Sequence, residues 1–219
     1  MPLFLTAFLI PFIGAYLIGS VPFGLIAGKM VKGVDVRDYG SGNIGATNVM
    51  RVLGPVWGSI VFVLDVLKGF IPTFFVALLL KKYGLDKEFA GWITVFIGIM
   101  TVLGHSFSCF LKFKGGKGVA TSLGVIVGLD WRVAIIGYVI YLIVLAIWRY
   151  VSLGSVIATL SVPVMFICFR YFDAPLSYKI LSGILFVAIF LKHIPNIKRL
   201  INHTEAKFGE KKTDTELKK

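Results

Sequence analysis

Long apolar segments separated by short polar ones constrain this chain more than any other feature. Of its 219 residues, 57% are hydrophobic and only 16% are charged, whereas about a quarter of a soluble domain is charged. About 20 apolar residues match the hydrocarbon thickness of a bilayer. The sequence therefore predicts an all-α integral membrane protein with seven transmembrane helices, at about 3–28, 54–80, 89–111, 117–129, 132–149, 151–170 and 177–194. The fourth segment is short, so five or six spans are the alternatives.

The distribution of Lys and Arg predicts the orientation of these spans. The first apolar segment lacks a preceding basic region and is longer than the apolar part of a signal peptide, so we expect it to be retained. Basic residues gather at 29–51, at 112–117 and from Lys192 onward. Cytoplasmic loops carry such an excess, which places the N-terminus outside and the C-terminus in the cytoplasm. We expect one polytopic membrane domain, 1–219, with a charged and mobile tail at about 205–219.

A glycine-rich polar segment, residues 38–51, lies between the first two apolar segments. It combines small residues with Ser41, Thr47, Asn48 and Arg51, and small residues allow backbone N–H groups to approach an anion while Arg supplies charge. Its GxGxxG pattern does not indicate dinucleotide binding, because an apolar helix rather than a strand precedes it. A helix-connecting loop with glycines at tight turns is the alternative to an anion site.

Two ionisable residues, Asp65 and Lys68, fall inside the second apolar segment. They are three positions apart and so lie on one helical face. A charge within a bilayer is costly and is expected to be paired or to face a wet cavity. Lys68 therefore either contributes charge to an anion pocket or forms an internal ion pair with Asp65.

A second loop contains the sequence Lys114-Gly115-Gly116-Lys117-Gly118 directly before an apolar helix. Backbone N–H groups at a helix N-terminus beside two ammonium groups are typical of a phosphate site. The alternative is a pair of lysines that flank a span on the cytoplasmic side. Just upstream, His105 alone is more typical of a packed histidine than of a catalytic one.

A third polar cluster, residues 193–205, follows the last apolar segment. His193 and Asn196 are one turn apart, and Pro195 is expected to end or bend the helix there. The alternative is a basic flank of the last span. The chain lacks the HxxxxD, HExxH and GxSxG signatures, and its His, Cys and carboxylate residues lack the spacing of a metal site. No protein nucleophile or base is obvious, and we expect no cofactor and no metal.

Several motifs occur together in one order along the chain. They are Gly19-Ser20-Val21-Pro22-Phe23-Gly24, GSGNIGATNVMR from Gly40, Asp65-x-x-Lys68-Gly69, GHSFSCFLKFKGGKGVATS from Gly104, and His193-x-x-Asn196. From Gly19 to Glu205 the chain resembles the bacterial acyl-phosphate:glycerol-3-phosphate acyltransferases, membrane enzymes that make lysophosphatidic acid. The resemblance implies a seven-helix fold in the bacterial inner membrane, with the active site at the cytoplasmic face. Its implied substrates are acyl phosphate and glycerol 3-phosphate.

The resemblance also implies the site residues. The catalytic set is Ser41, Arg51, Lys117, His193 and Asn196. The resemblance adds Thr47, Asn48 and Ser155 as further substrate contacts. The polar loops and the second apolar segment complete the predicted substrate- and phosphate-binding set with Gly40, Gly42, Asn43, Gly45, Lys68, His105, Lys114, Gly115, Gly116 and Gly118. We expect a monomer in contact with membrane lipid, and the net charge of +12 fits anionic lipid rather than nucleic acid.

Two hypotheses compete with this interpretation. Ser41, activated by His193, would act as a covalent nucleophile instead of a group that stabilises the oxyanion. A transporter of an organic phosphate or lipid would also use cationic loops and buried charges. Transporters place binding groups near the bilayer midplane and carry repeats, whereas the polar loops of this chain gather on one predicted face.

Overall fold

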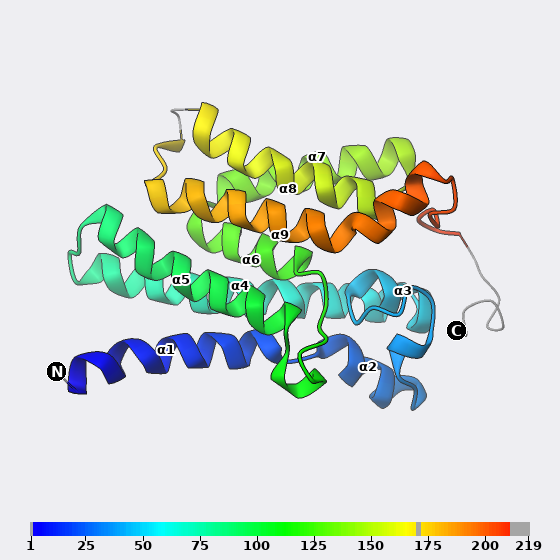
Figure 1. The fold of residues 1–219 in the computed structure, drawn as a ribbon, viewed down its shortest axis with the longest axis horizontal. Helices are drawn as coiled ribbons and strands as arrows, with labels where there is room; N and C mark the ends of the chain where they lie inside the picture. The colour runs from blue at the N-terminus through cyan, green and yellow to red at the C-terminus, as the bar shows by residue number, and fades with distance from the viewer. Residues whose placement is uncertain (1, 170–171, 211–219) are drawn as a thin grey trace. The chain divides into compact units, whose positions relative to one another are not determined.

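The structure, a computed structural model, is built from helices joined by short loops (Figure 1). It describes residues 2–169 and 172–210, with side chains from residue 9 onward. The elements are α1 (Pro2–Ser20), α2 (Phe23–Lys32), η1 (Val36–Asp38), α3 (Ala46–Leu53), α4 (Pro55–Lys82), α5 (Lys87–Ser106), η2 (Cys109–Leu111), α6 (Val119–Leu129), α7 (Trp131–Trp148), α8 (Val151–Cys168) and α9 (Leu176–Ile201). The all-helical fold predicted from the sequence is confirmed.

Six of these helical segments are long and apolar enough to cross a membrane. They are Leu9–Lys32, Pro55–Lys82, Lys87–Leu111, Trp131–Trp148, Val151–Cys168 and Leu176–Ile201. The segment expected as a fourth span is α6, whose 11 residues extend about 16 Å at 1.5 Å per residue. That length is about half of the hydrocarbon thickness, so the count of seven spans stays a prediction. Arg170, placed at the end of the sixth predicted span, lies outside the described residues.

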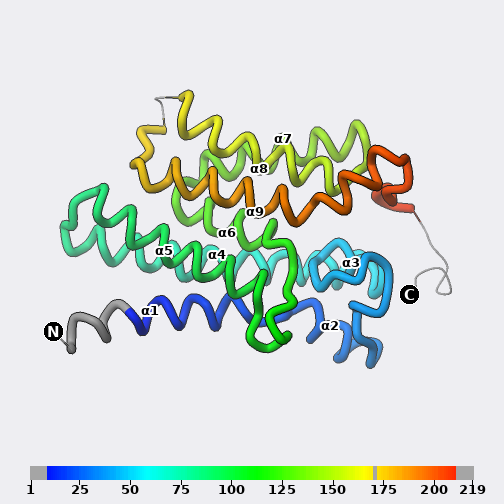
Figure 2. The backbone as a smooth tube through the Cα atoms, viewed as in Figure 1, coloured from blue at the N-terminus to red at the C-terminus, as the bar shows by residue number. Residues whose placement is uncertain are grey.

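The sequence predicted one continuous helix for the first apolar segment, but the structure has two helices there. The break lies at Val21 and Pro22, between α1 and α2 (Figure 2). Proline has no N–H to donate to the preceding turn, and it disfavours helical backbone at the residue before it. The chain therefore leaves the first helix at Ser20 and starts a second one at Phe23.

The described residues divide into two compact units, each of which is described by itself. The first contains Met1–Gly69 and Met100–Gly124, and the second contains Phe70–Ile99 and Val125–Glu210. In the first unit, α1 and α5 approach with their backbones in contact. A Cβ at Gly19 would collide with the Thr101 carbonyl, and one at Gly104 with the Tyr16 carbonyl. Small residues permit this kind of packing between membrane helices.

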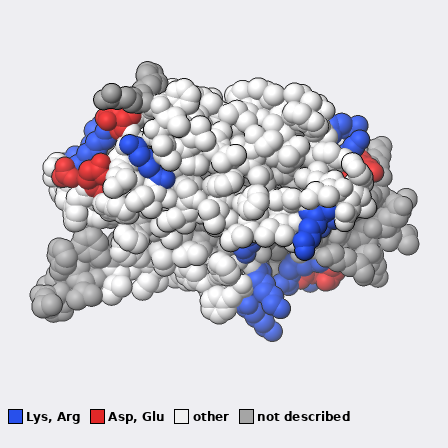
Figure 3. Space-filling view, turned by 45° about the horizontal axis from the view of Figure 1, so that its top comes forward, with Lys and Arg blue, Asp and Glu red and all other residues white. Residues whose placement is uncertain are grey.

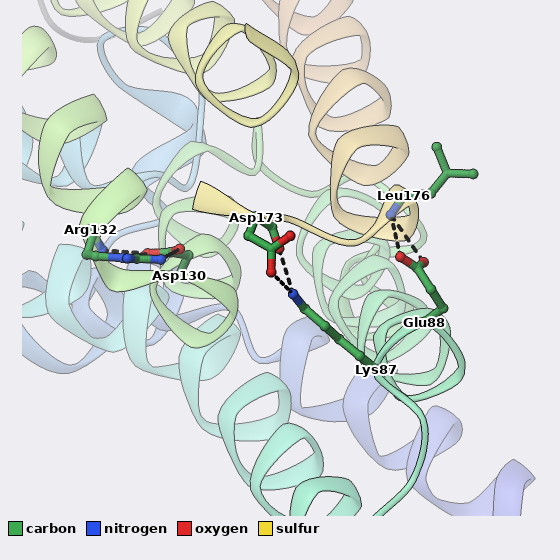
Figure 4. A network of polar contacts seen from close by, with 6 residues as sticks. All are labelled: Lys87, Glu88, Asp130, Arg132, Asp173 and Leu176. Atoms are coloured by element: carbon green, nitrogen blue, oxygen red, sulfur yellow. Dashed lines mark hydrogen bonds and ion pairs between the residues drawn. The ribbon is translucent and has the colours of Figure 1, made fainter. Parts of the chain in front are cut away.

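In the second unit, α7, α8 and α9 lie side by side (Figure 1). A polar network joins the start of α5 to the segment before α9 (Figure 4). Lys87 Nζ lies 2.5 Å from Asp173 Oδ2, and the Glu88 carboxylate accepts hydrogen bonds from the Leu176 N–H at 3.2 and 3.3 Å. Glu88 thereby satisfies an N–H at the first turn of α9, where a negative charge is also favoured by the helix dipole.

Most of the surface that faces the viewer in Figure 3 belongs to residues other than Lys, Arg, Asp and Glu. Exposed large apolar side chains occur on every long helix, for example Ile13, Phe75, Ile147 and Leu191. A soluble protein rarely exposes so much apolar surface, whereas a bilayer solvates it. The arrangement fits the integral membrane class predicted from composition.

Candidate active site

The glycine-rich loop, residues 39–45, takes its shape from one buried side chain, Asn48. The Asn48 amide nitrogen donates to the carbonyls of Val36 at 2.8 Å, Tyr39 at 3.2 Å and Asn43 at 2.8 Å. Its amide oxygen accepts from the Ser41 N–H at 2.8 Å. Asn48 is 1% exposed, so both ends of its amide are used inside the loop. Asn48 thus shapes the loop, and a contact with substrate stays a prediction.

Two glycines of this loop have backbone conformations that other residues rarely adopt. Gly40 and Gly42 have φ angles of 56° and 69°, and only glycine enters this region without a steric penalty. The Asn43 side chain accepts from the Gly45 N–H at 2.9 Å, and Gly45 precedes the first turn of α3. The turn therefore ends in a helix whose start is fixed by local bonds.

The side chains predicted to act on substrate remain at the surface of this region. Ser41 is exposed, while Thr47 and Arg51 are partly exposed. Thr47 and Arg51 both belong to α3 and are four residues apart, so they lie on one face of it. Ser41 belongs to the glycine-rich loop, and Thr47 and Arg51 to the helix that follows it directly.

Asp65, Lys68 and His105 form a buried charged cluster in the first unit. Lys68 Nζ lies 2.7 Å from Asp65 Oδ1, and His105 Nδ1 lies 3.6 Å from the same oxygen. Lys68 Nζ also donates to the Val21 carbonyl at 2.9 Å, at the break between α1 and α2. The exposed fraction of Lys68 is 4% and that of His105 is 3%. The ion-pair alternative fits this geometry better than a phosphate contact for Lys68.

The lysine–glycine loop, residues 114–118, is folded tightly against the end of α5. Gly115 N–H donates to the Ser106 carbonyl at 3.2 Å, and Gly116 N–H donates to the His105 carbonyl at 3.0 Å. A Cβ at Gly115 would collide with the His105 carbonyl oxygen, and one at Gly116 with His105 Nε2. The loop therefore packs directly against His105. Helix α6 begins at Val119 as the sequence predicted, with Lys117 partly exposed just before it.

Several of the backbone N–H groups that were expected to hold phosphate are bonded within the chain. In the glycine-rich loop and α3, the N–H groups of Ser41, Gly42, Gly45 and Asn48 donate to acceptors of the chain itself. In the lysine–glycine loop the N–H groups of Lys114, Gly115 and Gly116 do the same. Backbone donors in folded segments are nearly always paired in this way. These N–H groups are therefore used within the chain, and the glycines of both loops serve turns or close approaches.

The second unit contains the remaining predicted catalytic residues, His193 and Asn196, on α9. Both are buried. His193 Nδ1 lies 2.8 Å from the Ile189 carbonyl oxygen, and because a carbonyl only accepts, Nδ1 carries a hydrogen. In the neutral ring Nε2 is then an acceptor. Helix α9 continues through Pro195 to Ile201, so of the two alternatives, an end or a bend, Pro195 does not end the helix, and a bend stays a prediction.

Glu205 links Asn196 to two other residues, and the sequence reasoning did not select it. Its Oε1 accepts from Asn196 Nδ2 and from Ser152 Oγ, and its Oε2 accepts from Arg199 Nε, each at 2.7 Å. Burial on its own would raise the pKa of Glu205. The hydrogen bonds from Asn196, Ser152 and Arg199 outweigh that effect and hold the pKa below its usual value. The feature of the sequence that could have identified Glu205 is that it is an acidic residue within the otherwise basic segment 192–209.

Ser155, predicted as a substrate contact, is buried and its hydroxyl donates to the Val151 carbonyl of the same helix at 2.8 Å. Ser152, one turn earlier, is the serine that reaches Glu205. Ser155 thus has a bond within α8, and its contact with substrate stays a prediction.

The start of the predicted mobile tail is packed against the turn between α7 and α8. Phe208 N–H donates to the Arg149 carbonyl at 2.6 Å, and Arg149 Nη2 donates to the Phe208 carbonyl at 2.9 Å. Lys207 Nζ lies 5.9 Å from the centroid of the Tyr150 ring. These contacts tie residues 207 and 208 to that turn, while mobility of the tail stays a prediction and residues 211–219 lie outside the described part of the chain.

Comparison with known proteins gives one consistent result. Residues 9–203 match the family described as "Glycerol-3-phosphate acyltransferase". Glycerol-3-phosphate acyltransferases of Fusobacterium nucleatum and Aquifex aeolicus are 45% and 42% identical, over 88% and 89% of this chain and 94% and 95% of theirs. A crystal structure of PlsY, an integral membrane glycerol 3-phosphate acyltransferase in its glycerol 3-phosphate form, superposes with a TM-score of 0.82 at 41% identity. That likeness covers 93% of this chain and 96% of the other.

Proposed function

Since this chain belongs to the glycerol-3-phosphate acyltransferase family, we propose that it transfers a fatty acyl group from acyl phosphate to the 1-hydroxyl of glycerol 3-phosphate. The products are lysophosphatidic acid and inorganic phosphate. A related solved structure is in a lysophosphatidic acid form, which supports the product. The observation that carries the proposal is the grouping of exposed Ser41 with Thr47 and Arg51 on one loop and helix.

The reaction needs little chemistry from the protein beyond positioning and charge. An acyl phosphate is a mixed anhydride, so phosphate is already a good leaving group. The 1-hydroxyl oxygen bonds to the acyl carbon, the bond between that carbon and the phosphate oxygen breaks, and the hydroxyl proton passes to the departing phosphate. Neutralising two phosphates and holding the near-attack geometry supply the rate. No cofactor enters this scheme.

Each side chain has a role in the proposal. Arg51, Lys117 and Lys114 neutralise phosphate, and Thr47 donates a hydrogen bond to it. Ser41 donates to the carbonyl oxyanion, which suits its exposed side chain. His193 and Asn196 orient phosphate or acceptor, and the Nδ1 hydrogen bond of His193 fixes its ring for this purpose. Glu205 keeps Asn196 in place. The glycines, Asn48, Lys68 and His105 support the loops.

The assay that tests the proposal uses the purified full chain in lipid nanodiscs. It is given glycerol 3-phosphate with palmitoyl phosphate, palmitoyl-CoA or palmitoyl acyl carrier protein as donor, and both monoacyl product and released phosphate are measured. We expect equal amounts of the two from acyl phosphate alone. Product from the thioesters but not from acyl phosphate would show that acyl phosphate is not the donor, although the protein would still be an acyltransferase.

The covalent alternative makes a separate prediction. If Ser41 carried the acyl group, Ser41→Ala would abolish turnover and the parent would show a burst of phosphate before glycerol 3-phosphate is added. Under the proposal, Ser41→Ala retains measurable activity and the two-substrate kinetics intersect. Removing one oxyanion donor costs about 100- to 1000-fold, so the residual rate is within reach of a radiochemical assay.

The transporter alternative is tested in sealed liposomes that contain the same preparation. Flux of glycerol 3-phosphate without acyl transfer would support it.

We further propose that the protein acts as a monomer in the bacterial inner membrane with seven spans, the N-terminus outside, and the active site toward the cytoplasm. Labelling of single cysteines from either side of intact spheroplasts tests this orientation.

A further inference from the structure

Three exposed phenylalanines lie in the segment between α5 and α6. Phe107, Phe110 and Phe113 are 46%, 59% and 63% exposed, and exposed Lys112 lies among them. We call residues 107–113 the phenylalanine loop. Aromatic rings beside lysines are typical of segments that lie in the membrane interface, with rings toward the acyl chains and ammonium groups among the headgroups.

The loop is a firmly built structure, not a loose connection. Ser108 Oγ donates to the Ser20 carbonyl at 2.6 Å, and Tyr16 OH donates to the Phe107 carbonyl at 2.7 Å. Leu111 is buried at 5% exposure and anchors the loop from inside. Lys112 and Phe113 have φ angles of 51° and 61°, a region costly for residues other than glycine. The fold thus holds Phe113 outward against a local penalty.

Its bond to Ser20 places the loop at the level where the first helix ends. The 19 residues of α1 extend about 28 Å, close to the hydrocarbon thickness of about 30 Å. The neighbouring exposed side chains of α1 and α5, such as Leu17, Ile18 and Leu103, are apolar. The loop therefore continues an apolar surface at the end of α1, beside the segment that Figure 1 shows between α1 and α2.

Helix α2, which follows α1 in the chain, also combines exposed apolar side chains with an exposed lysine. Ile26 and Met30 are 40% and 77% exposed, and Lys29 is exposed on the same short helix. Lys29 and Lys112 provide positive charge next to exposed apolar side chains. Each basic residue near an anionic leaflet is attracted by about 1 kcal/mol.

We propose that the phenylalanine loop and α2 form an interfacial site for anionic lipid, with Phe110 and Phe113 in the upper acyl region and Lys29 and Lys112 at lipid phosphates. The lysine–glycine loop begins directly after Phe113. Attachment of the phenylalanine loop to lipid holds Lys117 near the headgroup plane, where a membrane-borne acyl substrate presents its polar end.

The test places a fluorescent probe in the loop of the full chain. Phe113→Cys, in a chain with Cys109→Ser and Cys168→Ser, is labelled with an environment-sensitive dye and reconstituted in phosphatidylglycerol–phosphatidylcholine vesicles. Lipids with a nitroxide near the top of the acyl chain should quench it strongly and its emission should be blue-shifted. Asp38→Cys, exposed in η1, is the matched control and should behave as a probe in water. Phe110→Cys provides a second site if the first labelled chain does not fold.

A second measurement tests the preference for anionic lipid. Quenching by nitroxide-labelled phosphatidylglycerol is compared with quenching by labelled phosphatidylcholine, and Lys112→Gln should reduce the preference for the anionic lipid by up to about fivefold. Equal quenching in the parent would overturn the anionic-lipid site. A water-like probe at both Phe113→Cys and Phe110→Cys would overturn the interfacial position. If the probe emission were blue-shifted but lipid nitroxides did not quench it, the loop would contact protein, such as a second copy of the chain, and the lipid site would be overturned.

Discussion

The glycine-rich loop and the lysine–glycine loop both carry predicted phosphate-binding residues, but they are held in different ways. In the first, the neutral side chain of Asn48 collects hydrogen bonds from one short stretch of chain. In the second, glycines allow the backbone to rest on His105, and His105 in turn lies beside the buried Asp65–Lys68 pair. The first loop depends on local bonds, whereas the second depends on a buried charged cluster.

The largest effect should come from breaking that charged cluster. Lys68→Met leaves the Asp65 carboxylate buried without its ammonium partner, which should cost about 3–5 kcal/mol of stability. Thermal unfolding in detergent measures this loss. The double variant Lys68→Met with Asp65→Leu should recover much of the stability and activity, because no charge remains to be paired. A stable but inactive double variant would mean that Lys68 contacts substrate. The support of the lysine–glycine loop by a buried ion pair would then not explain the effect.

The next largest effect is expected from substitutions of Gly115 and Gly116 in the lysine–glycine loop, which should respond differently to a change at His105. Gly115→Ala and Gly116→Ala should each lower kcat/KM by about 100-fold, the scale expected when catalytic groups are displaced by about 1 Å. The added methyl of Gly116→Ala meets the His105 ring, so His105→Ala should partly rescue it. Gly115→Ala meets a backbone oxygen, so His105→Ala should not.

Gly14→Ala is the control for both glycine substitutions, because nothing lies within 4 Å of its Cβ position. It should leave kcat/KM unchanged. Equal rescue of both variants by His105→Ala would show that the loop does not rest on His105 in the way described.

A smaller effect is expected in the glycine-rich loop. Asn48→Asp keeps the acceptor for Ser41 N–H but removes the donors to three carbonyls, at a cost of about 1–3 kcal/mol for buried groups that lose a partner. Asn43→Asp keeps the acceptor for the Gly45 N–H and should cost much less. A comparison of KM for glycerol 3-phosphate and of unfolding temperature between the two variants measures the difference. Equal effects would contradict the special position of Asn48.

The sequence predicted those parts of the molecule that depend on local patterns. Apolar length located the long helices. The spacing of Asp65 and Lys68 placed them on one helical face, and their ion pair is one of the two alternatives that followed from it. Composition did not reveal which glycines approach another segment, because Gly115 and Gly116 owe their role to His105, about ten residues away. Glu205 was missed for a similar reason, since its partner Ser152 is distant in the sequence.

The smallest effect should come from acid, and it should separate the second unit from both loops. Because hydrogen bonds lower the pKa of Glu205 in the folded state, its ionised form stabilises the fold above the usual pKa near 4.5, and this contribution is lost as pH falls through the lowered value. Unfolding temperature should therefore decline more steeply below that range in the parent than in Glu205→Gln. Asn48 has no charge to lose, so Asn48→Ala should keep the slope of the parent. Equal slopes for the parent and Glu205→Gln would mean that the charge of Glu205 does not hold the second unit together.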